Sequence, residues 1–259
     1  MCNQKPELNQ KPDKNAPIGV FDSGVGGLTV AREIMRQMPE ERIVYFGDTA
    51  RVPYGSKSQD TIIRYSRQII RFLMTKHVKA IVIACNTASA YALATVEKEF
   101  DVPIIGVIRA GARTAVQVTR NGKIGVIATE GTIGSGIYTQ EIKKLRPDIE
   151  VTGKPCPLFV PLVEEGLLHD SVTDEIASRY LSSLKSRFVD TLVLGCTHYP
   201  LIRSTLGRLM GNDVTLVNPA YETAIELRDL LQKYGLSCDE ENTGGEKYQF
   251  FVSDQTEKF

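Results

Sequence analysis

Short apolar runs alternate along this chain with segments in which apolar residues recur at helical spacing. The apolar runs predict strands at 18–21, 42–46, 81–84, 102–108, 123–129, 149–152, 191–195, 214–217 and 247–253. The helical spacing predicts helices at 28–38, 58–76, 89–99, 112–119, 135–145, 159–166, 174–185, 205–210 and 221–234. Runs of β-branched residues with no charge on either face are typical of strands buried on both sides of a parallel sheet. The order of elements therefore predicts an α/β fold of mainly parallel sheets flanked by helices.

The same order of elements occurs twice. Ile18 and Ile124 begin similar strands 106 residues apart, and Cys85 and Cys196 end similar strands 111 residues apart. Chance is an alternative explanation, because any protein of alternating strands and helices contains short apolar strands that can be aligned with one another. The shared Cys-polar-polar ending of the second pair makes coincidence the weaker explanation. The repeat predicts two pseudo-symmetric lobes with the active site in the crevice between them.

The limits of the lobes follow from where the repeat begins and ends. We expect the first lobe to comprise residues 18–108 and 218–259, because the last helix and strand follow the second repeat and are expected to cross back. Residues 109–217 form the predicted second lobe. The polar residues 1–17 show no apolar period and predict a disordered N-terminal lead.

Two cysteines mark the ends of the matching strands. Cys85 follows the apolar run in KAIVIACNTASA, and Cys196 follows the apolar run in DTLVLGCTHYPL. Ligands of open α/β sheets bind at the carboxyl ends of the strands. The two thiols are therefore expected to face the same crevice.

Composition narrows the classes of function. The 259 residues include 31 Lys and Arg against 31 Asp and Glu, so there is no basic surplus for a phosphate backbone, and nucleic acid is not an expected partner. No apolar segment approaches the length of a membrane span, and the first 17 residues lack the apolar core of a signal peptide. We expect a cytoplasmic protein that does not contact a membrane. Five scattered cysteines argue against a disulfide framework and leave thiols free for chemistry.

Two thiols facing one crevice permit few kinds of chemistry. A metal site is not expected, because neither cysteine belongs to a Cys-x-x-Cys pair and the chain has only three histidines. A redox disulfide stays open, although the pair lacks the adjacent spacing of thioredoxin-type sites. A hydrolytic nucleophile would use one cysteine and leave the second without a role. Two thiols on opposite faces of one carbon suit stereoinversion, in which one thiolate removes a proton and the other thiol donates one.

Thiols need polar neighbours for this task, since a free thiol ionises only near pH ~8.5. Asp22 and Asp48 end the first two strands and are expected beside Cys85, whereas His198 and Glu164 can serve the second thiol. Each has an ordinary alternative: a turn or helix cap for the aspartates, a structural role for the histidine and a solvated helix position for the glutamate. As a set at strand ends, these residues favour acid/base function.

Small hydrogen-bonding residues surround the same strand ends. Those expected to hold a carboxylate and an amino group of a substrate are Ser23, Asn86, Thr87 and Thr197, with Tyr54 and Gly55 closing over it. The glycine-rich segment that follows Asp22 does not fit the dinucleotide motif G-x-G-x-x-G, and the chain contains no P-loop. We therefore expect no cofactor.

Five segments carry a resemblance to a known family. They are FDSGVGGLTV from residue 21, YFGDTARVPYGSKS from 45, IACNTASA from 83, VPLVEEG from 160 and LGCTHYPL from 194. In this order they closely resemble the bacterial glutamate racemases of the aspartate/glutamate racemase superfamily, and the resemblance covers about residues 18–253. CNTA and GCT are shared by several branches of the superfamily, whereas DSGVGG, VPYG and GCTHYP are similar to the glutamate branch.

The resemblance implies a cofactor-independent racemase that interconverts L- and D-glutamate, supplies D-glutamate for peptidoglycan in the cell wall and forms a homodimer. It implies that Cys85 handles the D-enantiomer and Cys196 the L-enantiomer. The substrate contacts that it implies are Asp22, Ser23, Tyr54, Gly55, Asn86, Thr87, Thr197 and His198. The residues that it implies as helpers of the thiols are Asp22, Asp48, Glu164 and His198.

One segment departs from the pattern of the family. Arg109, Ala110 and Gly111 stand where relatives often carry an acidic residue and a proline, which puts hinge behaviour or dimer contacts in doubt, but not the chemistry. Two rival functions stay open: a racemase for aspartate or a hydantoin, and a non-catalytic protein that binds an amino acid between two lobes.

Overall fold

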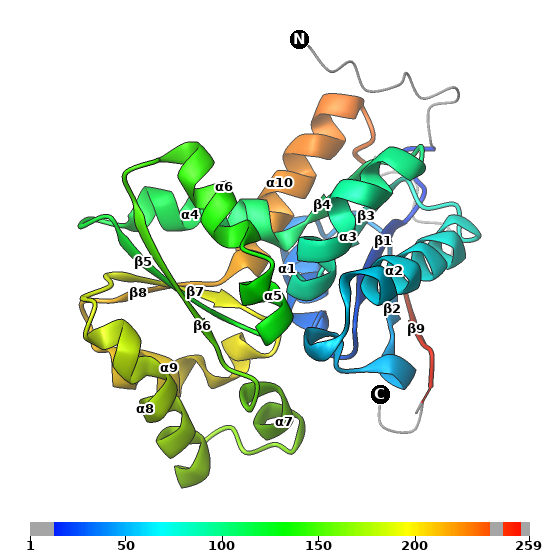
Figure 1. The fold of residues 1–259 in the computed structure, drawn as a ribbon. Helices are drawn as coiled ribbons and strands as arrows, with labels where there is room; N and C mark the ends of the chain where they lie inside the picture. The colour runs from blue at the N-terminus through cyan, green and yellow to red at the C-terminus, as the bar shows by residue number, and fades with distance from the viewer. Residues whose placement is uncertain (1–12, 239–245, 255–259) are drawn as a thin grey trace.

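The computed structural model describes residues 13–238 and 246–254. Two sheets of parallel strands lie side by side, and helices flank each of them (Figure 1). This arrangement confirms the predicted α/β fold with two sheet-based lobes. Within the described part of the chain, no helix has the length and apolar character that a membrane crossing requires.

The first sheet has the strand order β4-β3-β1-β2-β9. Its strands are β1 (Ile18–Asp22), β2 (Ile43–Gly47), β3 (Ala80–Ile83), β4 (Ile104–Gly106) and β9 (Tyr248–Val252). Its helices are α1 (Leu28–Gln37), α2 (Gln59–Met74), α3 (Asn86–Glu99) and α10 (Pro219–Tyr234). Alternate residues of β3 face opposite sides: Val82 packs with α1 and α10, whereas Ile81 and Ile83 pack with α2 and α3. Burial on both faces explains why the sequence of β3 is continuously apolar.

The second sheet has the strand order β6-β5-β7-β8. Its strands are β5 (Lys123–Ala128), β6 (Glu150–Pro155), β7 (Thr191–Gly195) and β8 (Thr215–Val217). Its helices are α4 (Val107–Val118), α5 (Glu130–Gly134), α6 (Ile137–Leu145), α7 (Phe159–Glu164), α8 (Ser171–Lys185) and α9 (Arg203–Met210). Three short 3-10 turns complete the described elements: η1 (Thr49–Arg51), η2 (Tyr54–Ser56) and η3 (Tyr199–Ile202).

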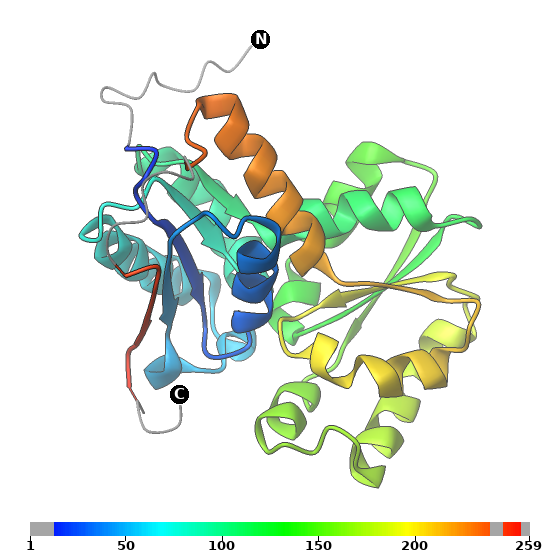
Figure 2. The same cartoon turned by 180° about the vertical axis from the view of Figure 1, so that it is seen from behind.

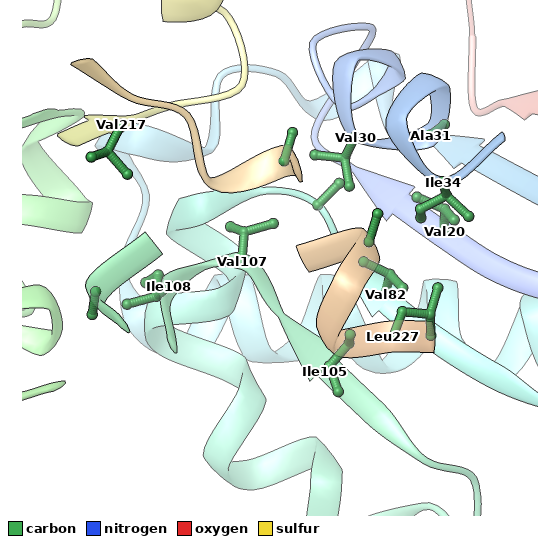
Figure 3. Packing of buried hydrophobic residues seen from close by; sticks show 14 of the residues in the cluster. Val20, Val30, Ala31, Ile34, Val82, Ile105, Val107, Ile108, Val217 and Leu227 are labelled. Carbon is green, nitrogen blue, oxygen red and sulfur yellow. The ribbon is translucent and has the colours of Figure 1, made fainter. Parts of the chain in front are cut away.

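One hydrophobic core runs from the first sheet to the second (Figure 3). It joins Val20 and Val82 of the first sheet to Val107 and Ile108 of α4, and continues to Val217 at the end of β8. Helix α10 lies where the two sheets meet and packs against both α1 and α4 (Figure 2). This shared apolar packing fixes how the strand ends of the two sheets face each other.

The structure corrects one predicted strand. The apolar run 102–108 is a strand only over Ile104–Gly106, and Val107 already begins α4. An added Cβ at Gly106 would lie 2.7 Å from Oγ of Ser89, which accepts the N–H of Val107 at 3.3 Å. This close approach lets the chain turn directly from strand to helix. The predicted boundary between the lobes, after residue 108, therefore falls inside a helix.

Several predicted helices begin at other residues than expected, and two of these starts have a local cause. Helix α3 begins at Asn86 and not at residue 89, because Cys85 caps it: its Sγ accepts the N–H of Ala88 at 3.4 Å. The predicted helix over 135–145 begins only at Ile137, because Gly136 takes the left-handed conformation with φ of 66°. These starts decide which side chains stand in the first turn of each helix.

A buried ion pair anchors the start of β3. Lys79 and Glu41 are both almost completely buried, and their side chains form an ion pair. Residues 13–17, which the sequence assigned to a disordered lead, form a turn whose Pro17 carbonyl accepts the N–H of Lys79 at 2.9 Å. Residues 1–12 of that lead lie outside the described residues. The other Glu41 oxygen accepts the N–H of Cys238 at 2.9 Å, so the pair ties two distant segments to the first sheet.

Replacing Lys79 with alanine is expected to destabilise the protein strongly, because the Glu41 carboxylate would stay buried without its cation. Removing one partner of a buried pair lowers the free energy of unfolding by about 3–5 kcal/mol, which urea denaturation can measure. The matched control is Arg179→Ala, which breaks the exposed Arg179–Glu175 pair and should cost less than ~1 kcal/mol. Equal losses in the two variants would contradict the anchoring role of Lys79.

Candidate active site

The two strand-end cysteines line one small cavity between the sheets. Cys85 follows β3 and Cys196 follows β7, and both are buried. The polar residues that line the cavity with them are Ser23, Tyr54, Gly55, Asn86 and Thr87 from the first sheet's side and Thr129, Thr197 and His198 from the second. Its volume is about 20 Å³, which is room for one water molecule. The structure thus brings together the residues that the sequence predicted as substrate contacts, apart from Asp22.

Asp22 is not among the residues that line the cavity, but it lies next to Thr197, which does, and it is completely buried. Its Oδ2 accepts the N–H groups of Gly24 at 3.1 Å and Gly27 at 3.0 Å, and its Oδ1 accepts the hydroxyl of Thr197 at 3.5 Å. Burial raises the pKa of Asp22, although the charge of His198 and the backbone N–H groups oppose this shift. A buried carboxyl with a raised pKa can exchange a proton with its neighbours more readily than a solvated one.

The glycine-rich segment after Asp22 has a steric explanation. A Cβ at Gly27 would lie 2.3 Å from the Cβ of Asp22, and a Cβ at Gly26 would lie 2.5 Å from the hydroxyl of Thr197 and 2.7 Å from the His198 ring. Only glycine allows the backbone to approach these side chains so closely. The segment therefore shapes the site itself.

The thiol of Cys85 stands in an environment that keeps it protonated. Burial and then the nearby charge of Asp22 raise the pKa of Cys85 to about 12, while hydrogen bonds from Ala88 N–H and Ser23 oppose the rise. Cys85 is therefore a thiol at neutral pH, ready to donate a proton. Asp22 influences Cys85 through its charge, and its predicted role as a proton-exchanging helper stays a prediction.

The thiol of Cys196 has a histidine beside it. Cys196 Sγ lies 3.8 Å from His198 Nδ1, and His198 Nε2 lies 3.1 Å from Glu164 Oε1. Burial lowers the pKa of His198, but its hydrogen bonds to Cys196 and Glu164 outweigh burial and raise the pKa to about 10. His198 is therefore protonated at neutral pH and presents a charged N–H to the sulfur, which favours negative charge there. Glu164 is partly exposed and links this pair to solvent.

Asp48 binds groups other than the thiols. One carboxylate oxygen accepts the hydroxyl of Tyr54, and the carboxylate also pairs with Arg51 Nε at 2.9 Å. Asp48 itself is completely buried, and its N–H donates to the carbonyl of Asp22 at 3.1 Å. In this structure Asp48 holds the Tyr54 ring against the cavity. Its predicted help to Cys85 stays a prediction.

Hydrogen bonds between the two lobes hold Asn86 and Thr87. The hydroxyl of Thr87 lies 2.9 Å from that of Thr129 and 3.1 Å from that of Thr132. The hydroxyl of Tyr138 donates to Asn86 Oδ1 at 2.7 Å. Both residues stand in the first turn of α3, directly after Cys85. The second lobe therefore sets the positions of two side chains that belong to the first.

Two residues at the site, Thr129 and Tyr138, were not predicted from the sequence. Thr129 stands 106 residues after Ser23, which is the spacing of the first landmark of the repeat, so the repeat itself carried the signal. Tyr138 lies inside α6, and no local pattern in the sequence distinguishes it from a core tyrosine. Among the residues that the structure describes, no group of three or more His, Cys, Asp or Glu is placed to hold a metal ion.

The arrangement places two thiols with different polar neighbours on the walls of one cavity. Cys85 carries its proton, and Cys196 faces the imidazolium of His198. Around them, Ser23, Asn86 and Thr197 offer hydrogen-bonding groups to a small polar ligand. Such a site can remove a proton from one face of a bound carbon and return one to the other.

Comparison with known proteins gives matches over most of the chain. The family model described as Asp/Glu/Hydantoin racemase matches residues 18–225. A glutamate racemase of Geobacter metallireducens is 51% identical over 237 residues, which are 92% of this chain and 87% of that protein.

Solved structures of glutamate racemases are also similar to this chain over most of its length. A glutamate racemase of Bacillus anthracis has a TM-score of 0.91 at 43% identity, covering 95% of this chain and 91% of that one. A glutamate racemase of Francisella tularensis in complex with D-glutamate has a TM-score of 0.88 at 41% identity, with the same coverage of 95% and 91%. These matches confirm the resemblance found in the sequence.

Cys196 is expected to react with iodoacetamide faster than Cys85 at about pH 7.5, because alkylation requires the thiolate. A thiol with a pKa of about 12 is almost entirely protonated at this pH. Peptide mass spectrometry of the full-length protein should give rates that differ by about tenfold or more. Cys156, whose pKa burial also raises to about 12, provides an unreactive internal reference. Alkylation of Cys85 at the rate of Cys196 would contradict the protonated state of Cys85 at this pH.

Proposed function

Because this chain belongs to the Asp/Glu/hydantoin racemase family, we propose that it is a cofactor-independent glutamate racemase that works by a two-cysteine mechanism. The observation that carries the proposal is the pair of strand-end thiols, one from each sheet, on the walls of one cavity. The relatives named glutamate racemase support glutamate as the substrate.

In the proposed reaction of L-glutamate, the Cys196 thiolate takes the proton from the α carbon. The Cys85 thiol then donates its proton to the opposite face of the same carbon, which inverts the configuration. The reaction of D-glutamate runs in reverse, with Cys85 as the base and Cys196 as the acid. General acid–base catalysis by a positioned group contributes about 10²–10⁴ in rate, so both thiols are required.

The neighbours of the two thiols differ in charge, and the proposed mechanism uses this difference. The imidazolium of His198 favours a thiolate at Cys196, and Glu164 binds the other nitrogen of the ring. Asp22 lies near enough to Cys85 to raise its pKa and is the proposed group for exchanging its proton. Asp48 supports the site through the ring of Tyr54.

Substrate must widen the cavity in order to bind. A volume of about 20 Å³ is far too small for glutamate. One close approach between the lobes is that of Gly55 of η2 to Thr129, where an added Cβ at Gly55 would lie 2.6 Å from the Thr129 Cβ. Separation of the lobes at this contact would admit an amino acid and close again over it. Ser23, Asn86, Thr87 and Thr197 are the proposed contacts once it is inside.

The proposed cellular role is the supply of D-glutamate for peptidoglycan, in the cytoplasm. This part rests on the resemblance to bacterial glutamate racemases. We also propose a homodimer. Its support on this chain is a groove of about 700 Å³ between α1 and α7, into which the exposed apolar side chains of Val25, Leu201 and Phe250 project. A second copy that covers this groove would remove these side chains from water.

Incubation of the purified protein with L-glutamate in deuterated water, without pyridoxal phosphate, should yield D-glutamate labelled at the α carbon. Cys85→Ser and Cys196→Ser should each lower the rate at least ~100-fold while glutamate still binds, because each removes one of the two acid/base groups. Cys156→Ser removes a buried thiol outside the cavity and is the matched control, with a rate expected within about twofold of wild type. Absence of deuterium at the α carbon of glutamate after incubation with the wild-type protein would contradict the proposal.

The racemisation assay, run with other substrates and with the Cys85→Ser variant, also separates the rival functions. A panel of aspartate and hydantoin substrates distinguishes the glutamate enzyme from other racemases of the family. A non-catalytic binding protein would bind glutamate equally well before and after Cys85→Ser and would have no racemisation to lose.

Sedimentation velocity tests the homodimer. Leu201→Glu places a charge in the apolar groove and should shift the protein towards monomer. Leu145→Glu is the matched control, because Leu145 is similarly exposed but stands at the end of α6, outside the groove. A monomeric wild-type protein, or equal dissociation in both variants, would contradict a dimer that covers this groove.

A further inference from the structure

Tyr138 connects the two lobes at the edge of the site. It belongs to α6 of the second lobe, its side chain is buried, and its hydroxyl donates to Asn86 Oδ1 of the first lobe at 2.7 Å. Asn86 stands directly after Cys85 and lines the cavity. The tyrosine hydroxyl thus touches a proposed substrate contact without lining the cavity itself.

The ring of Tyr138 lies beside two glycines. An added Cβ at Gly195, which precedes Cys196, would lie 3.2 Å from Cε2 of the ring, and one at Gly111 of α4 would lie 3.4 Å from the hydroxyl oxygen. The absence of a side chain at these two positions leaves space for the ring. Burial and the nearby charge of Cys196 raise the pKa of Tyr138, so the hydroxyl keeps its proton and remains a hydrogen-bond donor.

The hydrogen bond from Tyr138 decides which end of the Asn86 side-chain amide is free to bind a ligand. With Oδ1 of Asn86 engaged by Tyr138, the Nδ2 group with its two N–H donors is the part left for the cavity. N–H donors bind a carboxylate and oppose an ammonium group. We propose that Tyr138 is a positioning residue, which orients the Asn86 amide so that its NH₂ group binds a carboxylate of the substrate.

This inference rests on the proposed function, because it assumes that an amino acid occupies the cavity. It adds a reason why the two lobes must close for tight binding. The Tyr138–Asn86 hydrogen bond crosses between lobes, as do the contacts of Thr87 with Thr129 and Thr132. The Asn86 amide is therefore oriented only when α6 stands against α3.

Tyr138→Phe tests the role, since it keeps the ring and removes only the hydroxyl. The loss of one buried neutral hydrogen bond should raise the KM for both L- and D-glutamate about three- to tenfold. The kcat should stay within about twofold, because binding to a carboxylate is lost equally from the ground state and the transition state. A general loss of structure would lower kcat as well.

Tyr199→Phe is the matched control. Tyr199 is also a buried tyrosine of the second lobe, and its hydroxyl donates to the carbonyl of Cys156 at 2.9 Å. Its KM for glutamate should remain within about twofold of wild type, although it loses a comparable hydrogen bond. Equal rises of KM in Tyr138→Phe and Tyr199→Phe would overturn the specific role of Tyr138.

Two replacements of Asn86 test the orientation of the amide. Asn86→Asp still accepts from Tyr138 but turns an anionic oxygen to the cavity, so it should raise KM more than Asn86→Ala does. In the Asn86→Ala background, Tyr138→Phe should change KM no further, because the two residues act through one hydrogen bond. An Asn86→Asp variant that binds glutamate better than Asn86→Ala would overturn the proposed orientation, and so would fully additive effects in the double variant.

The outcomes separate this inference from the function on which it rests. Wild-type racemisation reports on the proposed function alone. With the wild type active, an unchanged KM in Tyr138→Phe overturns the role of Tyr138 and leaves the racemase proposal intact. If the wild type does not racemise glutamate, the racemase proposal and the proposed role of Tyr138 are both overturned.

Discussion

Apolar packing of α4 and α10 between the two sheets is the interaction on which the site depends. The core that joins Val82 of the first sheet to Val217 of the second sets how the two cysteine strands face each other. Hydrogen bonds between the lobes, such as that from Tyr138 to Asn86, are short and directional and form only if this packing places the lobes correctly. The non-directional hydrophobic force therefore brings the lobes together, and the polar contacts select one arrangement of the side chains.

The two halves of the fold are alike, but the two sides of the site are not. Ser23 and Thr129 occupy matching strand ends, whereas the position that matches Asp22 is Ala128. One thiol therefore has a buried carboxyl nearby, and the other has a histidine in hydrogen-bond reach. Because burial strengthens both electrostatic effects, the two sulfurs stand in different electrostatic environments. A symmetric scaffold thus carries the chemical asymmetry that transfer of a proton across one carbon requires.

Much of this architecture could be read from local sequence patterns. The run before Cys85 identified a strand buried on both faces, and the parallel sheet then placed the thiol at a ligand-binding edge. Patterns failed where contacts are distant in sequence. No local pattern showed that the carboxylate of Asp48 binds Tyr54 and Arg51, or that Gly26 lacks a side chain because Thr197 and His198 lie so close.

The sequence by itself determined the α/β fold, the repeat and the two thiols at strand ends, because hydrophobic period and strand termini are local properties. Only the tertiary structure decided which groups lie within a few ångströms of each thiol, and hence that Cys85 keeps its proton. It also decided that Tyr138 reaches Asn86 across the lobes, a contact between residues 52 positions apart. Burial and hydrogen-bond geometry depend on packing between distant segments, and no local pattern of residues encodes them.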